Sequence, residues 1–406
     1  MKHSIITLIC LLVCTTYSHA QDARLVQIQD KTTEITALLS EVAKNGNHKD
    51  AIVPLQEFIT LLDTTTIYQN PDLNMSKGAI TSYKGDMQYD LACCYSRIGD
   101  KKNALAELEK AVNNGYYNYN NLLYDNDLAS LRTNKKFKVM LAIVKERQPY
   151  EVLKRSNKYK KESNTDIPAF AYQPKEHPNL QLVREYFQLD TIPGKDNELE
   201  HIKNILHFAH DKIRHNGNNR TICEFDAIDI YNYHRATGNG VNCRQLAISL
   251  CDMYLALGYK ARVVTCLPAN PDDYECHVIN SVYSQTLDKW LYIDPTMDAW
   301  VMDESNNMLS IAEVRERLID GRPLVLCETA NWNHEQQQTK EYYLYEYMAK
   351  NLYYFVCKSR SFFNQESIYR STDNEDIRLI PAGFENGSYE SAKTTTDPER
   401  FWAKPE

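Results

Sequence analysis

Long apolar runs, blocks of like charge and paired metal-binding cysteines are what this 406-residue sequence lacks. Beyond residue 20, no stretch reaches the roughly 20 apolar residues that a membrane-spanning helix needs, so we predict no membrane span. No long block of Lys or Arg occurs and the net charge is only −8. Neither nucleic acid nor an anionic membrane surface is therefore an expected partner. C-x-x-C pairs of the zinc-knuckle kind are also absent, and we predict no metal and no cofactor.

The bulk composition is that of a folded protein. Hydrophobic residues make up 43% of the sequence and charged residues 25%, which is typical of soluble globular proteins rather than disordered or fibrous ones. The length favours two or three domains over one.

The first 20 residues have the pattern of a signal peptide. A charged start precedes an apolar run at residues 5–14, and the small and polar residues 18–20 fit a cleavage site before Gln21. Lipid attachment at Cys14 is less expected, because Val13 is bulky where a small residue is needed. We therefore expect export to the periplasm or the extracellular space.

Loss of that segment would remove Cys10 and Cys14 and leave nine of the eleven cysteines. An odd number leaves at least one thiol unpaired within the chain. For a chain of this size, nine cysteines do not make a disulfide-dense scaffold. The sequence does not determine which of the other cysteines pair.

Residues 21–150 are predicted to form a helical domain, because apolar residues recur there at three- and four-residue steps. The clearest unit, at residues 88–112, has the spacing of a tetratricopeptide repeat. Small Ala92 and Ala104 would let two helices approach closely, and Gly99 would turn the chain between them. Such a module either binds a protein partner or supports the rest of the chain structurally, and both interpretations remain open.

A polar, lysine-rich stretch at residues 151–166 is predicted to be a linker. It precedes a predicted catalytic domain at residues 167–340, in which a helix is expected over 197–213. A glycine-rich turn at 237–240 then leads to Cys243, after which apolar residues repeat at helical spacing as far as Gly258. Cys243 is thus expected in the first turn of a helix, where the helix dipole favours a thiolate.

Three strands are predicted beyond this helix. Their segments are residues 259–266, 274–283 and 290–294, so His277 falls within the second and Asp294 ends the third. Neighbouring antiparallel strands can place these two side chains next to each other on one face. The expected fold is therefore α+β, with a helix that carries Cys243 packed on an antiparallel sheet. Cys243, His277 and Asp294 are candidates for a nucleophile, its base and the carboxylate that orients the base.

These segments resemble the transglutaminase-like superfamily, whose core has a papain-like Cys-His-Asp site. The nucleophile segment GNGVNCRQLAISLCDMYLALGYKARVV, the histidine strand ECHVINSVY and the aspartate strand KWLYIDPTMD follow in the family's order. The resemblance implies that Cys243 is the nucleophile, that His277 is the general base and acid, and that Asp294 orients His277. The repeat-like N-terminal part resembles exported bacterial members. The oxyanion donor stays open between the backbone N–H of Cys243 and a side chain of the loop at 216–219.

The resemblance implies two-step acyl transfer without a cofactor, on a peptide, protein or other amide-bearing substrate. Hydrolysis, as in a cysteine protease or amidase, is the preferred interpretation. A protein-glutamine crosslinking transglutaminase is an alternative, and so is a non-catalytic binding or scaffold protein on a degenerate fold of this type. Two metal hypotheses carry little weight: one uses His207, His210 and Asp211, and the other uses Cys266, Cys276 and His277.

Residues 341–406 are predicted to be an aromatic extension packed on the catalytic domain. Six tyrosines occur within residues 341–356, and they suit either a substrate-binding wall or an amphipathic packed segment. A late strand is expected at 377–381, and Phe401 and Trp402 are expected to dock back on the fold.

Overall fold

The computed structural model describes residues 23–70, 76–161, 167–217, 219, 221–273, 275–366, 376–385, 387, 389 and 392–406. The chain divides into two compact units, Met1–Glu151 with Asp272–Glu275, and Val152–Pro271 with Cys276–Glu406. The predicted signal peptide lies outside the described residues, as do residues 162–166 of the predicted linker. Within the described ranges, no helix has the length and apolar character needed to cross a membrane.

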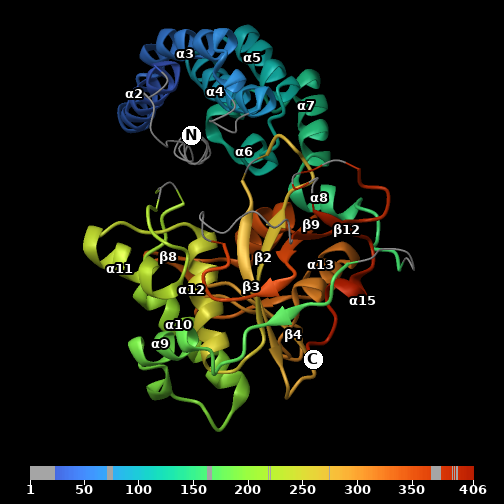
Figure 1. Cartoon of the computed structure of the whole chain (residues 1–406). Coiled ribbons are helices and arrows are strands. Elements are labelled where there is room, and N and C mark those ends of the chain that lie inside the picture. Colours follow the sequence, from blue (N-terminus) through green and yellow to red (C-terminus); the bar gives the residue numbers. More distant parts are fainter. Residues whose placement is uncertain are drawn as a thin grey trace. The chain divides into compact units, whose positions relative to one another are not determined.

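The first unit is helical, as predicted. Its main helices are α2 (Ala23–Asn45), α3 (Ile52–Thr64), α4 (Lys77–Arg97), α5 (Lys101–Asn113), α6 (Tyr119–Tyr124) and α7 (Lys135–Glu146), and α8 (Pro149–Lys154) follows at the boundary (Figure 1). Short 3₁₀ turns lie between them at His48–Ala51, Ile67–Gln69 and Asn126–Leu131.

Helices α4 and α5 pack closely because their contact positions are small. Ala92 and Ala104 are completely buried, and Gly99 turns the chain with a φ of +84°, which favours glycine. The Asp100 side chain then caps α5 by accepting a hydrogen bond from the backbone N–H of Asn103. Sequence spacing thus predicts this helix pair correctly.

The second unit is built on a six-stranded sheet in the order β12-β11-β9-β2-β3-β4. Its strands are β2 (Ala261–Leu267), β3 (His277–Ser284), β4 (Lys289–Ile293), β9 (Tyr354–Lys358), β11 (Asp376–Leu379) and β12 (Lys393–Thr395). Neighbours are antiparallel except β11 and β12, which are parallel.

Helix α12 (Cys243–Ala256) lies against the sheet at β2 and β3 and contacts three further helices. These are α9 (Pro178–Tyr186), α10 (Glu198–Lys212) and α11 (Ala227–Thr237), and α13 (Ile311–Asp320) contacts β4. Every residue of α12 from Gln245 to Ala256 is buried. The helix is therefore the central support of this unit, and it presents its first turn to the site.

Short elements complete the second unit. They are β1 (Ala171–Tyr172), η5 (Leu189–Thr191), β5 (Val301–Met302), β6 (Val325–Leu326), β7 (Asn331–Trp332), β8 (Gln336–Gln337), the π-helix η6 (Glu341–Met348), α14 (Ala349–Asn351), β10 (Arg360–Ser361) and α15 (Pro398–Phe401).

The C-terminal residues do more than pack on this unit, because β9, β11 and β12 are half of its sheet. The expected late strand is present as β11. Phe401 is fully buried, and its carbonyl oxygen accepts a hydrogen bond from the buried guanidinium of Arg262. The sequence did not predict that these strands belong to the sheet of the second unit. A strand that pairs with a distant segment of the chain leaves no local signal in the sequence of that segment.

Candidate active site

Cys243 is the first residue of α12, and the turn before it is fixed by backbone-directed hydrogen bonds. Asn242 and Gln245 form a reciprocal capping box. Gly240 is required by space, because a Cβ there would lie 2.8 Å from the carbonyl oxygen of Arg214 and from the backbone nitrogen of Asn216. Cys243 is partly exposed as a residue.

His277 and Asp294 lie together at one end of neighbouring strands. His277 begins β3, and Asp294 directly follows β4. The Nε2 of His277 is 2.7 Å from Oδ2 of Asp294, and both side chains are fully buried. Since a carboxylate only accepts, Nε2 donates, and Nδ1 of His277 is left for another partner.

Four donors surround the Asp294 carboxylate. Oδ2 accepts from His277 and from the hydroxyl of Tyr343 at 2.6 Å, while Oδ1 accepts from the backbone N–H groups of Thr296 and Met297. Burial alone would raise the pKa of Asp294, but the positive charge of His277 and these hydrogen bonds hold that pKa below its ordinary value. The carboxylate therefore stays ionised and fixed in orientation.

The same balance activates the thiol. Burial alone would raise the pKa of Cys243, but hydrogen bonds from His215 and His277 and the charge of His277 lower it well below the ordinary thiol value. For His277, burial would lower the pKa, while the charge of Asp294, its hydrogen bond and the contact with Cys243 raise it. These opposed shifts favour a thiolate–imidazolium pair near neutral pH. The structure thus brings the three sequence-predicted residues into one chain of contacts.

Three residues of this site were not predicted from the sequence. Tyr343 and Tyr347 come from the π-helix η6, a helix type that often occurs at functional sites. The hydroxyl of Tyr347 lies 3.1 Å from Nδ1 of His277. His215, in the loop after α10, bridges to Val241 and helps to lower the pKa of Cys243. The tyrosine pair has a sequence signal, since four-residue spacing places two side chains on one helical face; His215 has none.

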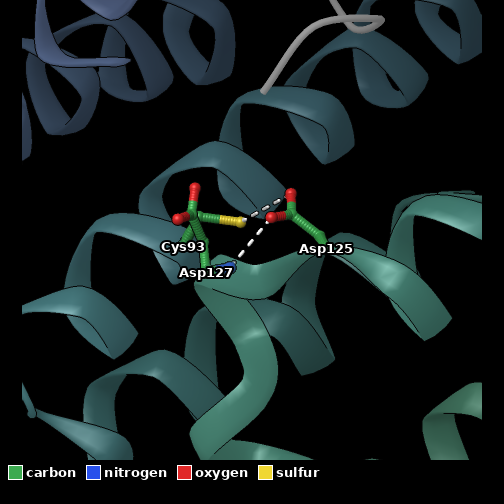
Figure 2. Close-up of side chains that lie close together, drawn as sticks. All are labelled: Cys93, Asp125 and Asp127. Carbon is green, nitrogen blue, oxygen red and sulfur yellow. Dashed lines mark hydrogen bonds between the residues drawn. The ribbon is translucent and has the colours of Figure 1, made fainter. Parts of the chain in front are cut away.

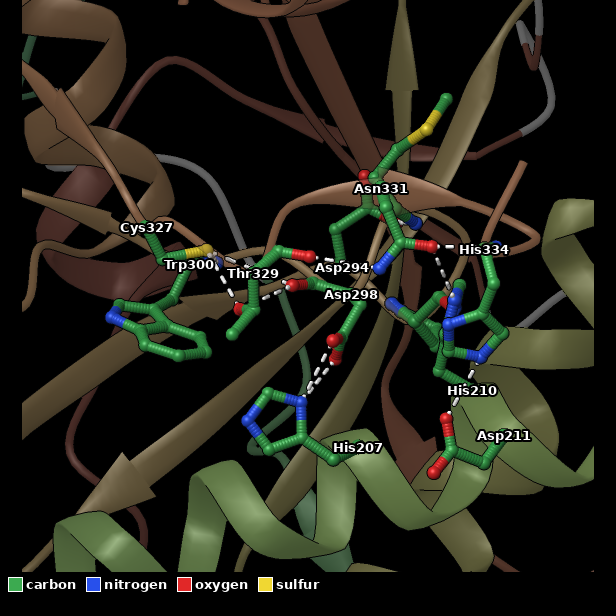
Figure 3. Close-up of polar contacts among 12 residues, drawn as sticks. His207, His210, Asp211, Asp294, Asp298, Trp300, Cys327, Thr329, Asn331 and His334 are labelled. Atoms are coloured by element: carbon green, nitrogen blue, oxygen red, sulfur yellow. Dashed lines mark hydrogen bonds and ion pairs between the residues drawn. The ribbon is translucent and has the colours of Figure 1, made fainter. Parts of the chain in front are cut away.

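The first metal hypothesis fails on geometry, because the nitrogens of the α10 histidines face separate partners (Figure 3). Nδ1 of His207 lies 2.6 Å from the Asp298 carboxylate. The Nδ1 of His210 lies 2.9 Å from the carbonyl oxygen of Pro295, and Asp211 instead pairs with His334. The contacts of His207 and His210 tie α10 to the turn that follows Asp294. They hold this turn in place rather than forming a set of metal ligands.

The second metal hypothesis fails because His277 is committed to Asp294 and Cys243. In the part of the chain that the structure describes, the one group with three metal-capable atoms close together is Cys93, Asp125 and Asp127, in the helical unit (Figure 2). Asp125 already accepts from the hydroxyl of Tyr89 and from the backbone N–H of Asp127. Burial raises the pKa of Cys93 well above its ordinary value, which keeps it a thiol. The group is a hydrogen-bonded cluster within the helical core.

Comparison with known proteins agrees with this geometry. Residues 187–295, which include Cys243, His277 and Asp294, match the model of the Transglutaminase-like superfamily. The second unit thus contains a transglutaminase-like domain. Residues 72–151 match a model described as A/B hydrolase-like, N-terminal domain. That description differs from the tetratricopeptide-like one, which stays a prediction.

A curated relative is similar over a shorter length. This relative, a chloroplastic protein of Arabidopsis thaliana, is 38% identical over 101 residues, which are 25% of this chain and 25% of that protein. The chain therefore spans about a quarter of that relative's length. No solved structure matches the chain.

Proposed function

We propose that the chain is a thiol acyl-transfer enzyme, in which Cys243 is the nucleophile, His277 the base and acid, and Asp294 the orienting carboxylate. The observation that carries this proposal is the buried His277–Asp294 pair, 2.7 Å apart, together with a partly exposed Cys243 whose thiol pKa is lowered by His277. A structural cysteine would gain nothing from a lowered pKa.

In the proposed mechanism, the Cys243 thiolate attacks the carbonyl carbon of an amide, and a C–S bond forms as the C=O electron pair moves to oxygen. When the intermediate collapses, the C–N bond breaks and Nδ1 of His277 gives its proton to the departing amine. Water then loses a proton to the same nitrogen and attacks the thioester, which releases a carboxylic acid and the Cys243 thiol. Asp294 stabilises the imidazolium in both steps and remains ionised.

Hydrolysis of a peptide or amide bond is the preferred outcome, as in a cysteine protease or amidase. A crosslinking transglutaminase, in which a lysine amine replaces water, is the second candidate. For the first unit we propose a protein partner, and for the chain we propose export to the periplasm or beyond. A non-catalytic scaffold would need no activated thiol, so the pKa and contacts of Cys243 favour the enzyme.

The test uses mature protein, fluorescein-labelled casein and a fluorescent primary amine. Release of labelled peptides that is lost in Cys243→Ser and His277→Gln supports the hydrolase. Cys223→Ser is the matched control, because Cys223 is also partly exposed but burial raises the pKa of its thiol to about 12. Incorporation of the amine into casein without cleavage would instead support crosslinking. If neither reaction depends on Cys243 over a panel of protein and peptide substrates, the proposal is wrong.

A further inference from the structure

Two imidazoles, those of His215 and His277, lower the pKa of the Cys243 thiol. His277 accounts for the base of the proposed reaction, and acyl transfer needs only one base at its nucleophile. His215, in the loop after α10, forms a β-bridge with Val241, two residues before Cys243, and it is a second cause of the lowered pKa of the Cys243 thiol. Its position at the reacting atom therefore requires a different role.

The hydrogen positions of the two rings differ, and this separates their roles. The indole N–H of Trp332 lies 2.9 Å from Nδ1 of His215. Because an indole N–H can only donate, Nδ1 must accept, and the hydrogen of neutral His215 sits on Nε2. His277 has the opposite arrangement toward the thiol, since its Nε2–H is committed to Asp294 and Nδ1 is left to take a proton. His215 thus faces Cys243 as a fixed N–H donor.

The backbone around His215 is held at both of its sides. The side chain of Asn333 accepts from the N–H of His215 at 2.8 Å and donates to its carbonyl oxygen at 2.9 Å. On the other side, Val241 donates to the carbonyl of Arg214 and accepts from the N–H of Asn216. This bridge ties the loop to the residues directly before Cys243, so the ring and the thiol are positioned by one rigid segment. Such preorganisation is what a transition-state donor requires.

We infer that His215 is a catalytic residue whose Nε2–H stabilises the oxyanion formed when Cys243 attacks a carbonyl. The inference rests on the proposed function and assigns a side-chain hydrogen-bond donor to the oxyanion of that reaction. As the C–S bond forms, the C=O electron pair moves to oxygen, and Nε2–H donates a hydrogen bond to it without transferring its proton. The backbone N–H of Cys243 is the second donor, because amides in the first turn of a helix have no intrahelical acceptor.

Asn219, in the loop at residues 216–219 that the sequence offers as a source of this donor, is engaged elsewhere. The amide of Asn219 donates to the carbonyl of Gly240 at 2.6 Å and to the hydroxyl of Tyr233 at 3.1 Å. Both of its hydrogens are therefore in use, and Asn218 lies outside the described residues. His215, directly before this loop, is held beside the residues that precede Cys243 by its bridge to Val241.

The experiment compares two reactions of Cys243 that differ in their need for an oxyanion donor. Acylation by p-nitrophenyl acetate passes through a tetrahedral oxyanion, whereas alkylation by iodoacetamide needs only the thiolate. Both rates are measured by rapid mixing over a pH range wide enough to reach their plateaus. For His215→Ala we expect the acylation plateau to fall by roughly 10²–10³-fold, the typical effect of losing one oxyanion donor. The alkylation plateau should stay within about three-fold, and its midpoint should move to higher pH, because the thiolate loses a hydrogen bond.

Four further variants make the result specific. His215→Gln keeps an N–H donor and should recover part of the acylation rate. Trp332→Phe removes the indole N–H that holds the hydrogen of His215 on Nε2, so that the tautomer with its hydrogen on Nδ1 can also form. It should lower the acylation rate about ten-fold with little change in the alkylation rate. His334→Asn, in the hairpin that carries Trp332, is the matched control and should change neither rate. His277→Gln should lower both reactions.

The possible failures can be distinguished. If His215→Ala retains the wild-type acylation plateau, or loses acylation and alkylation in equal proportion while folded, the inference is wrong and the proposed function stands. A wild-type Cys243 that reacts rapidly with neither reagent would overturn the proposed function, and the role of His215 with it.

Discussion

Removing the Tyr343 hydroxyl should destabilise the second unit and disturb Asp294 in a way that depends on pH. This hydroxyl is fully buried, donates to Oδ2 of Asp294 at 2.6 Å, and lies 2.6 Å from the hydroxyl of Tyr292. Tyr343→Phe removes a hydrogen bond to the charged carboxylate of Asp294 and leaves the buried hydroxyl of Tyr292 without that hydrogen-bond partner. Together these effects should lower the free energy of unfolding by about 2–4 kcal/mol.

The pH dependence follows from the lowered pKa of Asp294. A carboxyl whose folded pKa is depressed adds stability above its unfolded pKa of about 3.9, and that stability is lost as the pH falls through the folded value. Tyr343→Phe weakens one cause of the depression. The difference in stability between wild type and variant should therefore be largest near neutral pH and shrink as the pH falls below about 4.

Urea unfolding followed by tryptophan fluorescence measures this effect selectively, because the four tryptophans, Trp290, Trp300, Trp332 and Trp402, all belong to the second unit. Tyr342→Phe, exposed on the same helical segment, is the control and should change stability by less than about 0.5 kcal/mol.

A double-mutant cycle tests directly how much the loss of a hydrogen-bond partner for the Tyr292 hydroxyl contributes. Tyr292→Phe/Tyr343→Phe removes both hydroxyls and should be more stable than the sum of the single changes predicts, by about 1 kcal/mol. The reasoning is refuted if Tyr343→Phe costs less than about 0.5 kcal/mol, or if the two single effects simply add.

Three other perturbations have outcomes set by the structure. Gly240→Ala should displace the loop that carries His215, lower the free energy of unfolding in urea by about 1–3 kcal/mol, and slow the acylation of Cys243. Gly238→Ala is its control, because a Cβ there meets nothing within 4 Å. It should lower the free energy of unfolding by about 1 kcal/mol through its positive φ alone and leave the acylation rate unchanged. The pKa of His207 is raised by its hydrogen bond to a carboxylate, so this pair stabilises the fold fully below about pH 6.5 and is lost as the pH rises through the folded value. His207→Gln should lower the free energy of unfolding by under about 1 kcal/mol at pH 5.5 and by less at pH 8.5. Asp211→Asn, which changes the exposed ion pair of the same helix, should leave the free energy of unfolding unchanged. Equal losses at both pH values for His207→Gln would contradict a stabilising ion pair between His207 and Asp298. Arg262→Met, which removes the guanidinium that donates to the buried carbonyl group of Phe401 and to the carbonyl group of Ala403, should lower the urea midpoint by an amount equivalent to about 2–4 kcal/mol, and an unchanged midpoint would show that those bonds are replaced.

The parts of the fold that follow from local pattern were predictable. The helix that begins at Cys243 is preceded by glycines and a capping asparagine and has apolar residues at helical spacing, so its start and its buried face could be inferred. The three strands β2, β3 and β4 follow each other along the chain, and their alternation and short connections are local signals as well. The sequence also placed His277 and Asp294 on neighbouring strands, and the structure brings them to 2.7 Å.

What could not be predicted depends on contacts between distant segments. β9 pairs with β2 across about 90 residues, and nothing near β2 indicates that partner. Tyr343 was recognised only as one member of a tyrosine-rich stretch, because its role depends on a carboxylate 49 residues away. His215 was missed for the same reason, since its tautomer is fixed by Trp332, 117 residues later.

The central claim is that Cys243 is an activated thiolate, and the pH dependence of its alkylation tests it most directly. Mature protein is treated with iodoacetamide from pH 4.5 to 9.5, and each labelled cysteine is quantified by mass spectrometry. Cys223 and Cys276 are internal references, because they are also partly exposed and burial raises the pKa of their thiols to about 12 and about 11. We expect Cys243 to label rapidly well below the ordinary thiol pKa of about 8.5, and His277→Gln to move its profile to higher pH. Labelling of Cys243 that begins only with the two reference cysteines, or that is unchanged in His277→Gln, would contradict the account.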